Sequence, residues 1–169
     1  MTNIGGPGFL VVIFALFVTA GAPVFVGISL LLIRWERMHA RRAFLVTNGA
    51  AIGAGLVVLL AWAAPSLGEG TGPYVLQLLL VFLGTALSVV IVLELLPIWV
   101  GTVVLTRRYA VPVDRAVVFV AIGWIVGVVV GIGLTAIVVP SIMAAVGAVP
   151  GALVGAAVLG PVLYRFTRG

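Results

Sequence analysis

The 169 residues carry few charges and many apolar side chains: 64% are hydrophobic, 8% are charged, and the formal net charge is +5. A soluble globular domain has roughly 45 to 50% apolar and about 25% charged residues, so this composition excludes that class and predicts an integral membrane protein with one membrane domain. The chain has no cysteine, which excludes disulfides, thiolate metal sites and thiol catalysis. We predict no metal site and no cofactor.

Five apolar segments are long enough to cross a bilayer, which takes about 20 residues of helix. In chain order they are residues 8–33, 43–64, 74–105, 116–139 and 142–163. The breaks between them are RWERMHARR, PSLGEGTG, TRRYAVPVDR and a tight turn at Pro140 and Ser141. With this last turn, Pro150 falls inside the fifth segment and predicts a kink there. The predicted fold is all-α, a polytopic bundle of five transmembrane helices.

The arginines predict the orientation, because positive residues stay on the cytoplasmic side. The first and third connections and the tail hold all of them, and the other connections carry only Glu69. The two basic connections contain Arg34, Arg37, Arg41, Arg42, Arg107, Arg108 and Arg115. We therefore expect a multi-pass protein of the cell membrane with its amino terminus outside and its carboxyl terminus inside, which requires an odd number of spans.

The same arginines indicate the partners. They lie in short connections between apolar segments, so the lipid bilayer and its anionic headgroups are expected as partners, and nucleic acid is not. The alternative is that these arginines determine topology alone, which already accounts for every one of them.

A shift of 74 residues brings the first two hairpins into an ungapped register and predicts an internal duplication. It places PVFVG, residues 23–27, on PIWVG, residues 97–101. The other coincidences are Arg34 with Arg108, Trp35 with Tyr109, Arg41 with Arg115, Gly49 with Gly123 and Gly53 with Gly127. This pattern favours two parallel hairpins and one extra span, with helix kinks at Pro23 and Pro97. The alternative is that membrane hairpins with basic loops look alike once a shift has been chosen.

Three sets of glycines at four-residue spacing predict close helix packing, because they leave one helix face without side chains. The sets are Gly49 and Gly53; Gly123, Gly127 and Gly131; and Gly147, Gly151 and Gly155. Packing within one chain is the simpler interpretation. A homo-oligomer or a membrane-protein partner is the alternative.

Glu94 is the one charged residue between Tyr74 and Thr106. Counting back from Val139 places it near the bilayer midplane, whereas counting forward from Tyr74 places it at the inner interface. At the midplane an ionised carboxylate costs at least about 2.5 kcal/mol, so it should face protein or water and have a partner. Asn48 is the candidate donor for such a site. At the interface Glu94 would instead reach headgroups or a basic residue.

Catalytic motifs are missing from the sequence. Glu36 and His39 have the E-x-x-H spacing of di-iron sites, but such sites need this motif twice and further carboxylates. There is no phosphate-binding loop and no nucleophile elbow, so an enzyme is not expected. The leading interpretation is a structural or accessory subunit of a membrane assembly. The alternative is a small proton- or cation-coupled transporter or channel that uses Glu94.

Overall fold

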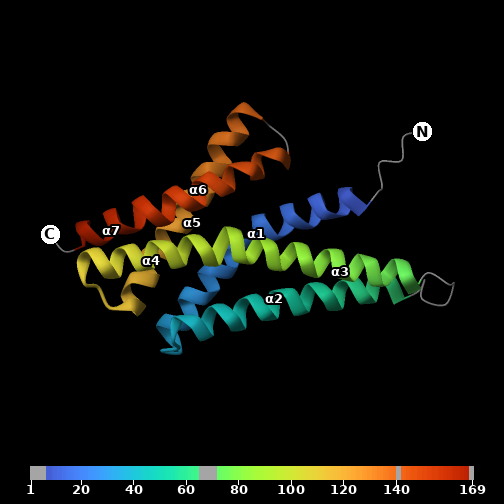
Figure 1. Ribbon diagram of the computed structural model, residues 1–169, viewed down its shortest axis with the longest axis horizontal. Coiled ribbons are helices and arrows are strands. Elements are labelled where there is room, and N and C mark those ends of the chain that lie inside the picture. The colour runs from blue at the N-terminus through green and yellow to red at the C-terminus, as the bar shows by residue number, and fades with distance from the viewer. Residues whose placement is uncertain (1–6, 65–71, 140–141, 168–169) are drawn as a thin grey trace.

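The computed structural model describes residues 7–64, 72–139 and 142–167, and every regular element in these ranges is a helix (Figure 1). The order is α1 (Pro7–Trp35), α2 (Ala40–Ala63), α3 (Gly72–Val89), η2 (Val90–Leu95), α4 (Leu96–Tyr109), α5 (Val113–Val138), η3 (Ile142–Gly147), α6 (Ala148–Val154), η4 (Gly155–Leu159) and α7 (Gly160–Phe166). Segments η2 and η4 are π-helical, and η3 is a 3₁₀-helix. The predicted all-α class is therefore confirmed.

Four helical runs in these ranges are long and apolar enough to cross a membrane. They are Ala40–Ala61, Pro73–Tyr109, Val113–Val138 and Ala148–Phe166. The second run joins α3, η2 and α4 into one continuous helix, and the fourth joins α6, η4 and α7. The first predicted crossing corresponds to α1, in which Gly21–Trp35 is a shorter apolar helix.

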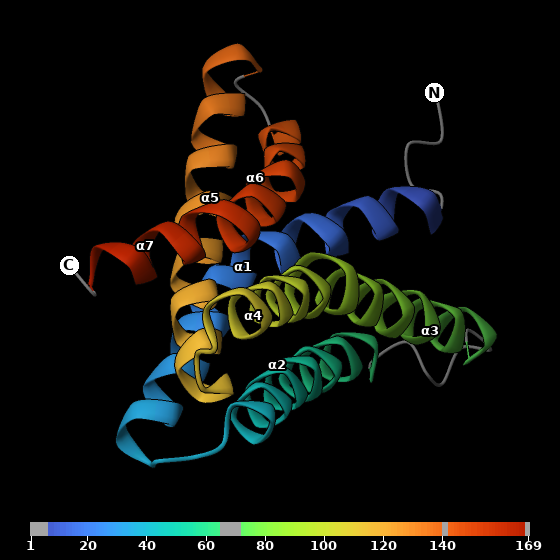
Figure 2. The same ribbon diagram turned by 60° about the vertical axis from the view of Figure 1, so that its left-hand side comes forward.

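Helix α5 lies at the centre of the bundle. It packs against α4, against α1, and against the whole run from η3 to α7. In Figure 2 it stands upright, and α6 and α7 cross it. The main core lies along its first half and contains the fully buried side chains of Val120, Trp124 and Val128. A smaller cluster, which includes Leu59 and Phe82, joins α2 to α3.

The helices extend further into the basic segments than the sequence predicted. The first basic connection is only residues 36–39 and the second only residues 110–112, so the predicted ends next to them were short by two to four residues. Arg34 lies in the last turn of α1, where a positive side chain interacts favourably with the helix dipole. An arginine at a helix end can extend its long side chain to water without ending the helix.

The last span differs from its predicted form. Helix α5 ends at Val138 and η3 begins at Ile142, so the chain breaks in the predicted region, although Pro140 and Ser141 lie outside the described residues. The long apolar helix begins only at Ala148 and continues to Phe166. Pro150 lies in the first turn of α6, directly after the 3₁₀ segment η3, where a missing amide hydrogen is tolerated.

The two basic connections share a backbone conformation. Arg37 has a φ of 49° and Ala110 a φ of 51°, both in the left-handed region. The residues just before the next helices also agree, with φ −59° and ψ 139° at His39 and φ −55° and ψ 138° at Pro112. The two connections therefore enter α2 and α5 with matching backbone angles at these positions.

The second connection is one residue shorter than the first, so the predicted shift of 74 residues holds only up to the connections. Trp35 and Tyr109 end their helices at the expected shift of 74, but α2 begins at Ala40 and α5 at Val113, a shift of 73. In the second helices Gly49 is thus level with Ile122 rather than with Gly123. The glycine coincidences at the shift of 74 are not structural equivalences.

Both π-helical segments precede a proline. Segment η2 ends two residues before Pro97, and η4 ends two residues before Pro161. The amide of Leu96 donates to the carbonyl of Ile91, five residues back. A proline ring clashes with the carbonyl four residues earlier, and widening the preceding turn relieves this clash. Pro23, in contrast, lies within the continuous helix α1.

Six of the eight predicted packing glycines bring two helical runs into backbone contact. A Cβ built at Gly127 would meet Gly151 and Gly155, and one at Gly131 would meet Gly147. The pairs run antiparallel between α5 and the last run: Gly123 with Gly155, Gly127 with Gly151, and Gly131 with Gly147. Gly49 and Gly53 differ, because a Cβ at either would have nothing within 4 Å. The backbone at these two glycines therefore makes no close contact with another described helix.

Candidate functional site

Asn48 and Glu94, which lie 46 positions apart, meet in the interior of the bundle. The side-chain amide of Asn48 on α2 donates to Oε1 of Glu94 on η2 at 2.8 Å. The same nitrogen donates to the carbonyl of Phe44 at 3.1 Å, one turn earlier in α2. Both amide hydrogens therefore point at acceptors, and this fixes which end of the Asn48 side chain faces Glu94. Asn48 is 7% exposed and Glu94 is 1% exposed.

Two oxygens of this pair are left without partners. Glu94 Oε2 and Asn48 Oδ1 are buried, and neither has a hydrogen bond in the described part of the chain. A buried polar atom without a partner loses its hydration free energy with no replacement, which costs about 1–3 kcal/mol. The pair can accept hydrogen bonds or bind a positive charge at these two oxygens.

The pair lies well inside the helices, away from the basic connections. Asn48 is eight residues after the start of α2 and Glu94 is fifteen residues before the end of α4. At about 1.5 Å per residue these are roughly 12 Å and 22 Å along the two axes. The partner that the structure provides for Glu94 is thus Asn48, not an arginine of a basic connection.

A tryptophan holds the π-helical segment that carries Glu94. The indole Nε1 of Trp124 on α5 donates to the carbonyl of Leu93 at 2.7 Å. Trp124 is fully buried and Leu93 is 4% exposed. Trp124 is not among the site residues predicted from the sequence. Two sequence signals point toward this contact: a buried Trp N–H needs an acceptor, and Pro97 has no amide hydrogen to donate to the carbonyl of Leu93. Neither signal shows that residues 93 and 124 meet.

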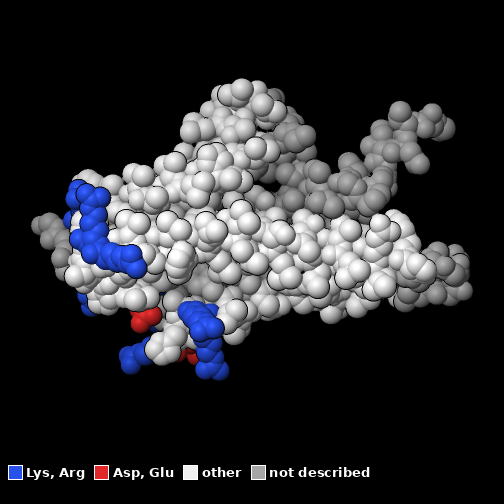
Figure 3. All heavy atoms as spheres, viewed as in Figure 1, with Lys and Arg blue, Asp and Glu red and all other residues white. Residues whose placement is uncertain are grey.

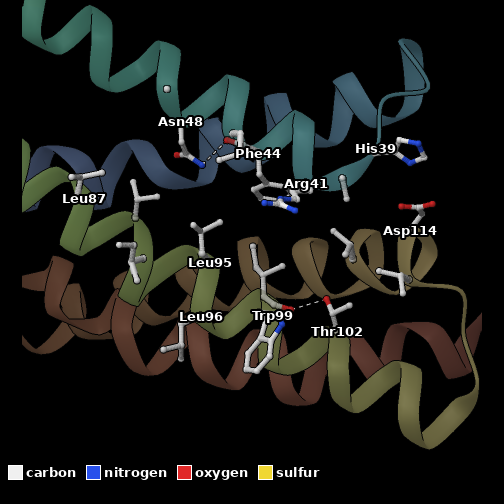
Figure 4. Close-up of a pocket in the computed structure, with 18 of the residues that line it drawn as sticks. His39, Arg41, Phe44, Asn48, Leu87, Leu95, Leu96, Trp99, Thr102 and Asp114 are labelled. Carbon is white, nitrogen blue, oxygen red and sulfur yellow. Dashed lines mark hydrogen bonds between the residues drawn. The ribbon is translucent and has the colours of Figure 1, made fainter.

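A groove lies beside the pair, between α2, the helix formed by η2 and α4, and the start of α5 (Figure 4). We call it the α2–α4 groove, and its volume is about 920 Å³. Asn48 lines it, whereas Glu94 does not, so Asn48 stands between the groove and the carboxylate. Most of its lining is apolar. The polar side chains in the lining are His39, Arg41, Asn48, Thr102 and Asp114.

The predicted arginines gather at one end of the molecule (Figure 3). On the face shown there, the rest of the surface carries no charged side chain, except for acidic residues next to the arginines. Glu36 and His39 lie in the first connection rather than on one helix face. Among the described residues no group of three or more His, Asp or Glu side chains could hold a metal ion.

Comparison with protein-family models, with curated proteins and with solved structures gives no match for this chain.

Proposed function

We propose that the chain is a five-span protein of the cell membrane, with its amino terminus outside and its carboxyl terminus in the cytoplasm. Four apolar helical runs and the 29-residue helix α1 support this topology. The α1–α2 connection, the α4–α5 connection and the end of α7 also lie toward the same side in Figure 1, and the arginines cluster there. Their charge favours the anionic headgroups of the inner leaflet.

Accessibility of single cysteines tests this topology, since the chain has none of its own. A membrane-impermeant thiol reagent should label Arg37→Cys and Ala110→Cys only in inside-out vesicles. It should label Ala64→Cys, at the exposed opposite end of α2, from the outside of intact cells. Labelling of Ala110→Cys and Ala64→Cys from the same side would overturn the proposal.

The duplication belongs to the same proposal, in a modified form. The two hairpins, α1 with α2 and the α3–α4 helix with α5, share the conformation of their connections. A one-residue deletion in the second connection then accounts for the change of shift from 74 to 73. The last run, from η3 to α7, is left over as the single extra span.

For the activity, we propose that Glu94 binds a proton or a small cation, and that the protein couples this binding to transport. The observation that supports it is the carboxylate itself, which is almost fully buried in an apolar bundle and has one free oxygen. Ionisable groups in this setting are expensive to bury and most often serve a function. The π-helical segment that carries Glu94 is also typical of functional sites.

The neighbours of Glu94 give a simple mechanism. Asn48 separates the carboxylate from the α2–α4 groove, and its amide holds Oε1. A proton or cation would arrive at Oε2 or at Asn48 Oδ1, the two atoms without partners. Rotation of the Asn48 side chain would open and close this route. Glu94 is therefore the binding group and Asn48 the group that positions it.

Reconstitution into liposomes tests this activity. An imposed pH, Na⁺ or K⁺ gradient should drive flux through the wild-type protein, read by a pH-sensitive or cation-sensitive dye inside the liposomes. Glu94→Gln keeps the shape and the acceptor for Asn48 but removes the charge, so flux should fall to the level of empty liposomes. Thr47→Val is the matched control, because Thr47 is a buried neighbour whose hydroxyl donates within α2, to the carbonyl of Ala43. Equal flux through Glu94→Gln and the wild type would reject the proposal.

A structural or accessory subunit is the second candidate. The observation that favours it is the uncovered face at Gly49 and Gly53, which has the spacing of a helix-packing surface. A second copy or a membrane-protein partner would cover it. Gly53→Leu should then release the partner during purification from native membranes, whereas Gly84→Leu, at another open glycine, should not. A wild-type protein that purifies as a solitary monomer would contradict this candidate.

A further inference from the structure

The length of the α2–α4 groove matches one leaflet of a bilayer. Its lining on α2 runs from Ala40 to Ile52, twelve residues or roughly 18 Å along the helix axis. Half of a hydrocarbon core of about 30 Å is about 15 Å. The groove thus has the length of one acyl chain in one leaflet.

Most of the groove is suited to such a chain. Its walls include Phe44, Leu45, Ile91 and Trp99, and Gly49 contributes no side chain, which leaves room along α2. The hydroxyl of Thr102 is used within its own helix, since it donates to the carbonyl of Ile98. Beyond its charged end the groove therefore offers an apolar channel that is interrupted only by Asn48.

The charged end of the groove carries both signs. Arg41, Asp114 and His39 all line the groove, and Figure 4 places His39 and Asp114 at the end nearest the two connections, with Arg41 further along, beside Phe44. In the part of the chain that the structure describes, no ion pair joins Arg41 to Asp114, and neither side chain has another ion-pair partner. Each is free to pair with a charge on a bound molecule. A groove that is lined by a cation and an anion is complementary to a zwitterion.

We propose that the α2–α4 groove binds one phospholipid with an amine headgroup. Arg41 pairs with the phosphate, Asp114 pairs with the ammonium group, and an acyl chain lies along α2 as far as Ile52. The headgroup end lies beside the basic connections, which assigns the lipid to the inner leaflet. This site rests on the proposed location in the membrane, and it does not depend on ion binding by Glu94.

Native mass spectrometry of the full chain tests the site, with dioleoyl phosphatidylethanolamine, phosphatidylcholine and phosphatidylglycerol as competing probes. We expect one phosphatidylethanolamine to be retained in preference to the other two. A hydrogen bond to a charged group is worth about 1.5–3 kcal/mol, which is tenfold or more in affinity. Arg41→Gln should thus weaken the binding of all three lipids about tenfold, and Asp114→Asn should remove the preference for phosphatidylethanolamine.

Two matched controls separate the groove from the rest of the surface. Arg107→Gln removes an exposed arginine that does not line the groove and should leave binding unchanged. Gly49→Leu fills the groove and should abolish binding, whereas Gly84→Leu should not. Both glycines have open space at Cβ, so neither variant should disturb the fold.

Several results would overturn this proposal. One is a preference for phosphatidylglycerol, and another is equal lipid binding by Gly49→Leu and the wild type. A third is a wild-type dimer that Gly49→Leu converts to a lipid-free monomer, because the groove would then be an interface between copies of the chain. Retention of the lipid by a wild-type protein that shows no ion flux would support this site while contradicting the proposed activity of Glu94.

Discussion

The indole nitrogen of Trp124 donates to the carbonyl of Leu93 at 2.7 Å, and this carbonyl lies four residues before Pro97, whose nitrogen has no hydrogen to donate to it. In an α-helix the amide of residue 97 would donate to the carbonyl of residue 93, but proline has no amide hydrogen. Trp124 supplies the missing donor from α5. The contact thus fixes the π-helical segment, and with it Glu94, against the central helix of the bundle.

Trp124→Phe should lower the free energy of unfolding by about 1–3 kcal/mol, because it removes the indole donor from the buried carbonyl of Leu93. Thermal unfolding in detergent, followed by circular dichroism, measures this change. Trp99→Phe is the matched control, since the Trp99 side chain is 67% exposed, and it should change stability little. Equal losses in the two variants would contradict the role of the indole hydrogen bond.

Pro97→Ala tests whether the Trp124 hydrogen bond replaces the amide hydrogen that proline lacks. It restores an amide hydrogen at position 97, so part of the stability that Trp124→Phe removes should return in the double variant. We expect the two substitutions to be non-additive by about 0.5–3 kcal/mol, the usual range for groups that share one partner. A strictly additive double-mutant cycle would show that Trp124 and Pro97 act independently.

The sequence predicted the helical class and the breaks between the long apolar segments, because hydrocarbon forces backbone polar groups into helices and puts charges at the ends. It did not predict how far the helices extend into the basic segments, since Arg34 and Arg107 can lie in last turns and still reach water. The two π-helical segments follow from Pro97 and Pro161, but Pro23 has no such segment. A proline alone therefore does not decide the local helix type.

For the candidate site, the sequence predicted the residues but not their contact. Glu94 and Asn48 stand out in the sequence because polar residues are rare in apolar runs, yet their contact could not be predicted. The run Pro73–Tyr109 has 37 residues, about 55 Å of helix, so either half of it could lie opposite α2. Glycine spacing likewise does not show which glycines contact another helix. It places Gly49 and Gly127 on equivalent patterns, but only Gly127 meets another helix in the described part of the chain.

The Asn48 and Glu94 pair should show strong coupling in stability. Asn48→Leu leaves both oxygens of Glu94 buried without donors, so we expect a loss of about 3 kcal/mol or more. Glu94→Leu should be milder, because the Asn48 amide still donates to the carbonyl of Phe44. The double variant should be more stable than Asn48→Leu alone. Thermal unfolding of the four proteins of the cycle measures this order, and a double variant less stable than Asn48→Leu would contradict it.

The antiparallel glycine contacts predict opposite effects of one substitution at two sites on α5. Gly127→Ala places a Cβ against the backbone of Gly151 and Gly155, so it should lower stability by about 1–3 kcal/mol. Gly133→Ala has open space around the new Cβ and should raise stability by up to about 1 kcal/mol through its better helix propensity. Thermal unfolding of both variants measures the two signs. Two changes of the same sign would mean that close helix packing is not what requires glycine at position 127.

The left-handed residue in the second connection predicts a stabilising change. Ala110, with its φ of 51°, ends α4 in a conformation that costs an ordinary residue about 1–2 kcal/mol and that glycine adopts freely. Ala110→Gly should therefore raise the free energy of unfolding by about 1 kcal/mol, despite the greater flexibility of glycine in the unfolded chain. Ala54→Gly, at an exposed position inside α2, should lower it by about the same amount. Arg37→Gly should follow Ala110→Gly, because both positions adopt the same turn. Losses of stability in all three variants would show that the two connections do not hold this conformation.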